Sequence, residues 1–120
     1  MKRDQIIVLI KSPKKEPIIK TIPNTEKAFR SIVDGNYEII DVKKNVVMID
    51  NEDCRTVTRF ANKYNFAITS KGEYIDTVKG TAFFCSRNGE DFDDIGSSDV
   101  LDLFYELGTE LYPDLEVDFT

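Results

Sequence analysis

Runs of apolar residues with the length of β-strands alternate with turn-forming residues in the first part of the chain. Apolar and β-branched residues fill Gln5 to Lys11 and resume over Pro17 to Ile22, and the Ser-Pro-Lys-Lys stretch between them is typical of a turn. The same arrangement recurs in Tyr37 to Val42 and Val46 to Asp50, which a Lys-Lys-Asn turn separates. These four runs predict two hairpins.

A helical pattern lies between the two hairpins. Its apolar residues repeat at intervals of three and four and share one face: Ala28, Phe29, Ile32 and Val33. Asn24 or Thr25 can accept hydrogen bonds from the free amides of the first turn, and Gly35 suits the left-handed conformation that closes a helix. Burial of the four side chains stabilises by about 6–12 kcal/mol, whereas ordering the segment costs about 15 kcal/mol. The helix predicted over residues 25–34 must therefore lie across a sheet.

The second half of the chain has a weaker pattern. Residues 55–70 show no regular period and predict a short strand within an irregular loop. Residues 74–75 and 78–85 are expected to be extended. The Asn-Gly pair that follows them is typical of a tight hairpin, which places Phe92 on a return strand.

A second helix is predicted near the end of the chain. Ser97 or Ser98 is expected to cap it, and Gly108 follows its last turn. Its predicted apolar face consists of Val100, Leu101, Phe104 and Leu107. Beyond it, apolar and acidic residues alternate over 109–120, which indicates an extended C-terminal tail or an edge strand.

Together these elements predict an α+β fold in a single domain over residues 1–120. We expect a mostly antiparallel sheet of five to seven short strands with two helices packed against it. The strand-rich ends favour a homodimer formed by strand addition.

Composition narrows the chemistry that the chain can perform. Histidine is absent, which removes the commonest general base and the commonest zinc ligand. Cys54 and Cys85 are too few for a disulfide framework and are expected to be reduced thiols. The sequence contains neither a phosphate-cradling glycine-rich loop nor a Gly-x-Ser-x-Gly elbow. We expect a cytoplasmic protein without catalytic activity, cofactor or membrane span.

Acidic residues are concentrated at the C-terminal end. Residues 88–120 hold 11 acidic side chains and no basic one, whereas residues 1–87 hold 16 basic and 11 acidic side chains. The overall charge of −6 argues against direct binding to nucleic acid. Carboxylates on a rigid surface can instead occupy a basic groove of a protein partner, or they can serve solubility alone. The candidate partner-binding residues are Asp91, Asp93, Asp94, Asp99 and Asp102.

Two metal-site hypotheses are less favoured than ordinary turns and caps. Four aspartates and Gly96 match positions of a calcium-loop register, but position 5 is Ile95, the last position is not glutamate and no helix precedes the loop. The nearest nuclease-like arrangement, Glu73, Asp76 and Lys79, has the wrong spacing.

A basic cluster offers an alternative binding function. Arg55, Arg59 and Lys63 recur every four residues and could converge on the phosphate of an anionic ligand. They could equally form a solvated face or ion pairs with the acidic end of the chain.

The order of these signals resembles an uncharacterised family of short bacterial and phage proteins classed as a domain of unknown function. The shared signals are Pro23-Asn24-Thr25, Gly35-Asn36-Tyr37-Glu38, Asn51-Glu52, Gly80-Thr81-Ala82-Phe83-Phe84 and Asp91-Phe92. The resemblance spans about residues 5–107. In the middle of the chain, Phe60-Ala61-Asn62-Lys63 replaces the Pro-Asn-Arg segment usual in the family.

That resemblance brings no assigned activity, but it implies a role in the biology of phages and other mobile elements, including antagonism of host defence. We therefore expect a non-enzymatic inhibitor or accessory protein that acts through its acidic surface on a basic protein. The alternative is a binder that sequesters an anionic, nucleotide-type signal through the basic cluster at a subunit interface.

Overall fold

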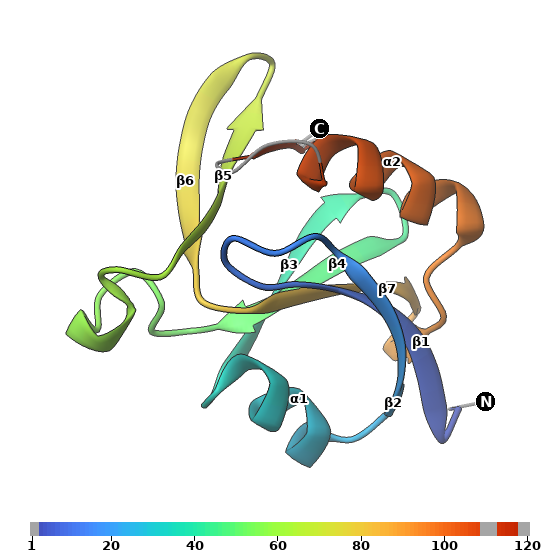
Figure 1. Cartoon of the computed structure of the whole chain (residues 1–120). Coiled ribbons are helices and arrows are strands. Elements are labelled where there is room, and N and C mark those ends of the chain that lie inside the picture. Colours follow the sequence, from blue (N-terminus) through green and yellow to red (C-terminus); the bar gives the residue numbers. More distant parts are fainter. Residues whose placement is uncertain (1–2, 109–112, 118–120) are drawn as a thin grey trace.

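The computed structural model describes residues 3–108 and 113–117 and confirms the α+β class (Figure 1). The described residues contain nine strands, two α-helices and one 3₁₀ turn. In chain order these are β1 (Gln5–Lys11), β2 (Ile18–Pro23), α1 (Glu26–Val33), β3 (Tyr37–Lys43), β4 (Val46–Asn51), η1 (Thr58–Phe60), β5 (Tyr64–Ser70), β6 (Glu73–Lys79), β7 (Ala82–Asn88), β8 (Asp91–Asp93), α2 (Ser97–Leu107) and β9 (Asp114–Glu116).

The strands form two sheets rather than the single sheet of five to seven strands that was predicted. The larger sheet has the order β2-β1-β7-β4-β3, with β8 paired to β7. The smaller sheet has the order β6-β5-β9, in which β5 and β9 are parallel and the other pair is antiparallel. The predicted hairpins β1–β2, β3–β4 and β7–β8 are all present and antiparallel.

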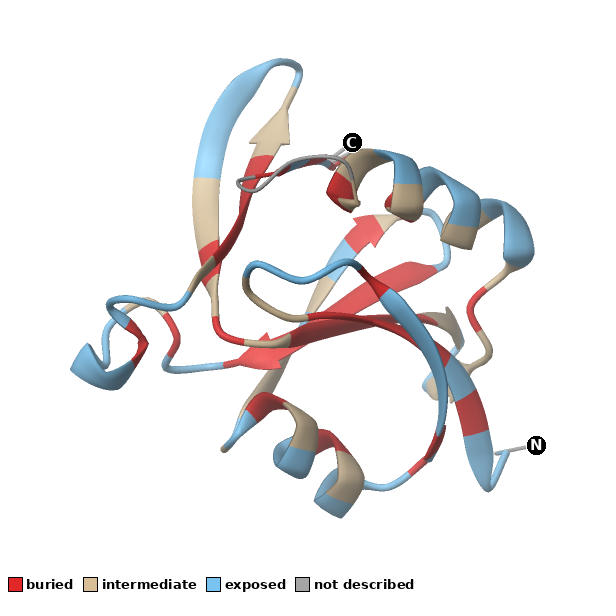
Figure 2. Cartoon of the chain, viewed as in Figure 1, coloured by how far each residue is buried: buried red, intermediate tan, exposed pale blue. Residues whose placement is uncertain are grey.

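The central strands of the larger sheet, β1, β4 and β7, are buried on both faces (Figure 2). On one face, alternate residues of β1, β4 and β7 pack with Phe29 and Val33 of α1, which confirms that this helix lies across a sheet. The intervening residues of the same strands pack with α2 and the smaller sheet. Because both faces are covered, these strands read as continuous apolar runs rather than as alternating ones.

Helix α1 begins as predicted and ends one residue earlier than the glycine suggested. Thr25 accepts a hydrogen bond of 3.2 Å from the amide of Ala28. The left-handed residue that closes the helix is Asp34, with φ 62°, whereas Gly35 follows at φ 145°. Glycine is still required at 35, because a Cβ there would lie 2.7 Å from the side chain of Asn51.

Helix α2 differs from its prediction at the cap and on the buried face. Its N-cap is Gly96, so Ser97 and Ser98 lie inside the helix. Leu103 and Leu107 are buried, while Leu101 is 71% exposed. The prediction that Leu101 faces the core is therefore wrong, because Leu103 supplies that contact.

The segment with the weakest sequence pattern contains a 3₁₀ turn followed by a full seven-residue strand, β5. The extended run predicted over 78–85 is broken at Gly80, where φ of 78° turns the chain from the smaller sheet into the larger one. A Cβ at Gly80 would lie 3.0 Å from the ring of Phe60, so the turn and the 3₁₀ segment pack in close contact.

Part of the C-terminal segment forms an edge strand. Strand β9 runs parallel to β5, with Leu115 buried and hydrogen bonds from Ala67 to Pro113 and from Val117 to Thr69. Residues 109–112 and 118–120 of the predicted tail lie outside the described residues. Within the described ranges, no helix has the length and apolar character needed to cross a membrane.

Candidate functional site

The three cations predicted to bind an anion fall into two separate groups. Arg55 reaches inward between β3, β4 and β6. Its guanidinium lies 2.7 Å from Glu38 and 3.5 Å from Asp50, and it also pairs with Asp76. Glu38 and Asp76 therefore neutralise Arg55 within the chain, which leaves little of its charge for a ligand.

Asp50 is the most perturbed acid in this group. Its side chain has no exposed surface, and Oδ1 accepts no hydrogen bond from a donor group of the described residues. Burial, followed by hydrogen bonding to Glu38 and the charge of Glu38, raises the pKa of Asp50 to about 8. A protonated carboxyl that donates to Glu38 accounts for this geometry, so the cluster can hold a proton near neutral pH.

The buried thiols are placed as reduced cysteines. Both Cys54 and Cys85 are free and buried. Burial raises the pKa of Cys54 and raises that of Cys85 to about 12. Both thiols therefore stay protonated at neutral pH, whereas a nucleophilic cysteine must be ionised.

The other two predicted cations, Arg59 and Lys63, lie beside the same aromatic ring. The guanidinium carbon of Arg59 is 4.4 Å from the ring centroid of Phe60, and the Lys63 ammonium is 5.7 Å from it. Arg59 also pairs with Asp34, Nη1 to Oδ2, at 2.6 Å. Lys63 and Phe60 line a cavity of about 370 Å³.

The five predicted partner-binding aspartates are divided between two elements. Asp93 and Asp94 follow one another at the end of β8, and Arg3 lies 3.5 Å and 3.1 Å from their respective carboxylates. Asp94 Oδ1 also accepts a hydrogen bond of 2.7 Å from the amide of Ile7. Asp94 thus links the β8–α2 connection to β1, and both acids pair with Arg3, which precedes that strand.

The remaining acids are less constrained. Asp91 lines a small cavity of about 150 Å³ that also includes Glu90 and Glu26. Asp99 and Asp102 lie in α2, and Asp102 is exposed. The calcium-loop register is thus split between a strand and a helix, and the described residues contain no group of three or more acids or cysteines positioned to hold a metal ion.

An apolar pair on the outside of α2 was missed by the sequence analysis. Tyr105 is 80% exposed and Leu101 is 71% exposed, and they are separated by one helical turn. Together with the exposed Ser98 and Asp102 they form the α2 outer face, which turns away from the sheet (Figure 2). The sequence signal was available, because Val100, Leu103, Phe104 and Leu107 form a complete buried face without Leu101.

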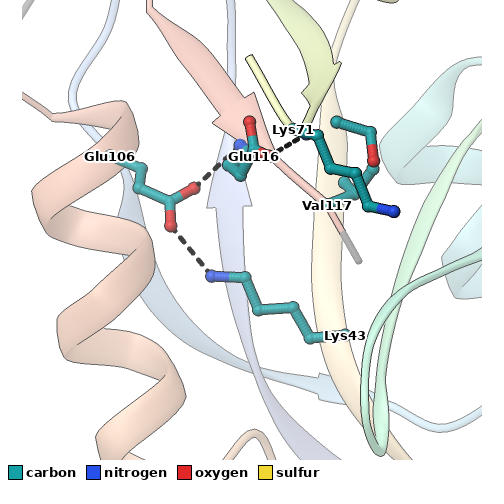
Figure 3. A pocket seen from close by; sticks show the side chains of 6 residues that line it. Lys43, Lys71, Glu106, Glu116 and Val117 are labelled. Carbon is teal, nitrogen blue, oxygen red and sulfur yellow. Dashed lines mark hydrogen bonds and ion pairs between the residues drawn. The ribbon is translucent and has the colours of Figure 1, made fainter. Parts of the chain in front are cut away.

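A second cavity, of about 350 Å³, lies where α2 meets β3 and β9 (Figure 3). Glu106 accepts a bond of 2.9 Å from Lys43 on β3 and one of 3.1 Å from the amide of Glu116 on β9. The Glu116 carboxylate accepts from Thr69 at 2.6 Å and from the amide of Lys71. These bonds lower the pKa of Glu116, with that from Thr69 contributing most. Glu106 thus links α2 to β3 and β9, and the Glu116 carboxylate links β9 to β5.

Fold and contacts define a two-sheet α+β domain. Most of its partly buried charged side chains are paired, and α2 exposes the apolar side chains of Leu101 and Tyr105. A family model for the Domain of unknown function (DUF3846) matches residues 2–107, and the chain belongs to that family. No curated protein and no solved structure matches the chain.

Proposed function

We propose that this protein is a non-enzymatic binding protein that docks on a basic protein through the α2 outer face. The observation that carries the proposal is the exposure of Leu101 and Tyr105, at 71% and 80%. An exposed leucine is ordinary in isolation, but an aromatic and an aliphatic side chain one turn apart provide the kind of anchor on which helix-mediated recognition depends.

Charge specifies the chemistry of the partner. Asp102 lies between the two apolar side chains in sequence and is exposed. No lysine or arginine occurs between residues 88 and 120, so every charged side chain of α2 and of the β8–α2 connection is acidic. The matching surface of a partner would carry positive charge around an apolar pocket. Such complementarity accelerates encounter and selects against acidic proteins.

The contact residues that we propose differ from the five aspartates predicted from the sequence. Asp93 and Asp94 are engaged by Arg3, which reduces their charge toward a partner. Asp102 keeps its carboxylate free of ion pairs among the described residues, and Leu101 and Tyr105 join it. Burial of each apolar side chain on a partner would contribute about 1.5–3 kcal/mol. A contribution of that size is enough for Leu101 and Tyr105 each to act as a binding anchor.

The family to which the chain belongs has no assigned activity, so the biological role is a separate part of this proposal. Antagonism of a host-defence protein by a mobile-element product is the role we favour, because an acidic surface suits the basic grooves of proteins that act on nucleic acid. A homodimer formed by strand addition stays a prediction.

The test compares matched surface variants against one purified partner. Proteins captured by the wild-type chain at low salt are identified, and a basic candidate is then purified and titrated by calorimetry. Tyr105→Ala is expected to weaken binding by at least about tenfold, the usual lower bound for an interface anchor. Tyr74→Ala provides the control, because this tyrosine is 64% exposed on β6, remote in sequence from α2.

Charge is tested in the same titration. Asp102→Lys is expected to weaken binding and to reduce its salt dependence, whereas Asp41→Lys on the exposed side of β3 is expected to do neither. Equal binding by wild type, Tyr105→Ala and Asp102→Lys would refute the proposal.

A further inference from the structure

The cavity beside Phe60 combines positive charge with hydroxyl donors. Four segments that are distant in sequence meet there: the β1–β2 turn, the end of α1, the segment from η1 to β5, and the β6–β7 connection. Its volume of about 370 Å³ falls in the range of small-molecule sites. We propose that this cavity binds a phosphate-bearing small molecule of mononucleotide size through Lys15 and Lys63.

The two lysines have charge available for a ligand. Both line the cavity, and neither has an ion-pair partner within 4.0 Å in the part of the chain that the structure describes. One acid, Asp34, also lines the cavity, but Arg59 pairs with its carboxylate at 2.6 Å. The lining therefore carries two uncompensated positive charges and one carboxylate that is already neutralised.

Two hydroxyl groups extend the set of possible contacts. Ser12 Oγ and Thr81 Oγ1 lie 3.1 Å apart, and both residues line the cavity. In such a pair one hydroxyl donates to the other, so the hydrogen of the second remains available to an external acceptor. A phosphate oxygen is a suitable acceptor, because charge-assisted bonds are stronger than neutral ones.

A third lysine, Lys11, contacts the backbone of a residue that lines the cavity. Lys11 is 1% exposed, and its ammonium donates to the Ser12 carbonyl at 2.8 Å and to Asn65 Oδ1 at 3.0 Å. Both acceptors are neutral, and no carboxylate pairs with Lys11 among the described residues. Asn65 in turn donates to Gly80, whose carbonyl belongs to another lining residue.

A buried cation without a carboxylate is costly, and burial lowers the pKa of Lys11 accordingly. An anion in the adjoining cavity would compensate part of that cost. This inference does not depend on the two surface lysines, and it favours the same sign of ligand charge.

Phe60 keeps Lys63 near the cavity. The ring is 2% exposed and packs on Gly80, so it is a support rather than a stacking surface for the ligand. The Lys63 ammonium lies 5.7 Å from the ring centroid, within the usual range of a cation–π contact. The lysine thus lies at the cavity with part of its conformational freedom already restricted.

The site differs from the one suggested by sequence spacing. Lys63 is retained, Arg59 acts indirectly by neutralising Asp34, and Arg55 belongs to another cluster. Lys15 and the hydroxyl pair, which come from segments remote in sequence, replace Arg55. The α2 outer face contributes no residue to this cavity, so the two proposals can fail separately.

Calorimetry and amide chemical shifts of the full chain at low ionic strength test the site. The probes are inorganic phosphate, adenosine monophosphate, adenosine and a short single-stranded DNA. We expect phosphate and adenosine monophosphate to bind and to shift the amides of Lys63 and Thr81, and adenosine to bind at least tenfold more weakly.

Variants decide whether the lysines are responsible. Lys15→Gln and Lys63→Gln are each expected to weaken the binding of adenosine monophosphate by about tenfold, the effect of losing one charge-assisted contact. Lys20→Gln and Lys27→Gln remove the same charge from exposed positions on β2 and α1 and are expected to change affinity less than twofold.

Three results would overturn the proposal. The first is no binding of phosphate or adenosine monophosphate at millimolar concentration by the folded protein. The second is equal weakening by the cavity and control variants. The third is tighter, lysine-dependent binding of the DNA than of the mononucleotide, which would indicate a polynucleotide surface instead.

Discussion

Replacing Asp50 by asparagine tests whether the Glu38–Asp50–Arg55 cluster holds a proton. Asp50 lies at the end of β4 with a fully buried side chain, and its pKa is raised from 3.8 to about 8. Asparagine has nearly the same shape, cannot ionise and can donate to Glu38 as a protonated carboxyl would. The substitution therefore reproduces the protonated state at every pH.

The sign of the effect follows from proton linkage. A carboxyl whose pKa is higher in the folded state than in the unfolded state binds its proton more tightly when folded. Its stabilising contribution is complete below pH 3.8 and is lost as the pH rises to about 8. A shift of this size corresponds to an upper bound of about 6 kcal/mol, and sharing of the proton with Glu38 is expected to reduce the measured fall to about 2–4 kcal/mol.

The assay is urea unfolding at several pH values between 5 and 8, monitored by circular dichroism. We expect the wild type to lose stability over this range relative to Asp50→Asn. The variant should exceed the wild type by about 1–2 kcal/mol at pH 5 and by about 2–4 kcal/mol at pH 8, so the difference widens as the pH rises. Asp41→Asn, an exposed change on the neighbouring strand, should leave the wild-type profile unchanged. Parallel pH profiles, or a variant less stable than wild type at pH 8, would refute the reasoning.

Three further predictions concern other parts of the fold. Gly80→Ala should cost about 1–2 kcal/mol more than Gly72→Ala in urea unfolding, because both have φ near 80° but only the first meets the Phe60 ring; equal costs would contradict this. Glu106→Gln should destabilise by about 1 kcal/mol through its weakened bonds to β3 and β9, and the loss should shrink at high salt; a salt-independent loss would show that charge is not involved. If the chain dimerises by strand addition at β2, Ile19→Lys should yield a monomer in light scattering, whereas a monomeric wild type would disprove the homodimer.

Local patterns predicted the local parts of the fold. Three hairpins and both helices followed from apolar spacing and turn residues, each within a short stretch of sequence. The second sheet did not. Its β5–β6 hairpin is local, but the apolar residues of β5 have no regular period, and β5 pairs with β9 across more than forty residues. The left-handed closure of α1 fell on Asp34 because Arg59 and Asn51 both donate to its carbonyl, contacts that depend on tertiary structure.

For the candidate sites too, the sequence predicted the local features but not the long-range contacts. The spacing of Arg55, Arg59 and Lys63 indicated a common face on a helix or a convergence in a loop. In the structure Arg55 instead turns toward acids of β3, β4 and β6, whereas the other two cations lie beside Phe60. The charge of Asp93 and Asp94 was evident from sequence, but their pairing with Arg3 joins opposite ends of the described chain. The pairing partners of charged side chains required the tertiary structure.

A sheet enclosed on both faces restricts where this family can acquire new specificity. The central strands β1, β4 and β7 of the larger sheet already pack into two cores, so a change there disturbs packing before it alters recognition. The α2 outer face, the β1–β2 turn and the β6–β7 connection face solvent at least in part. Substitutions there disturb either core less. Substitutions on these three surfaces can therefore alter what the protein binds while leaving both cores intact.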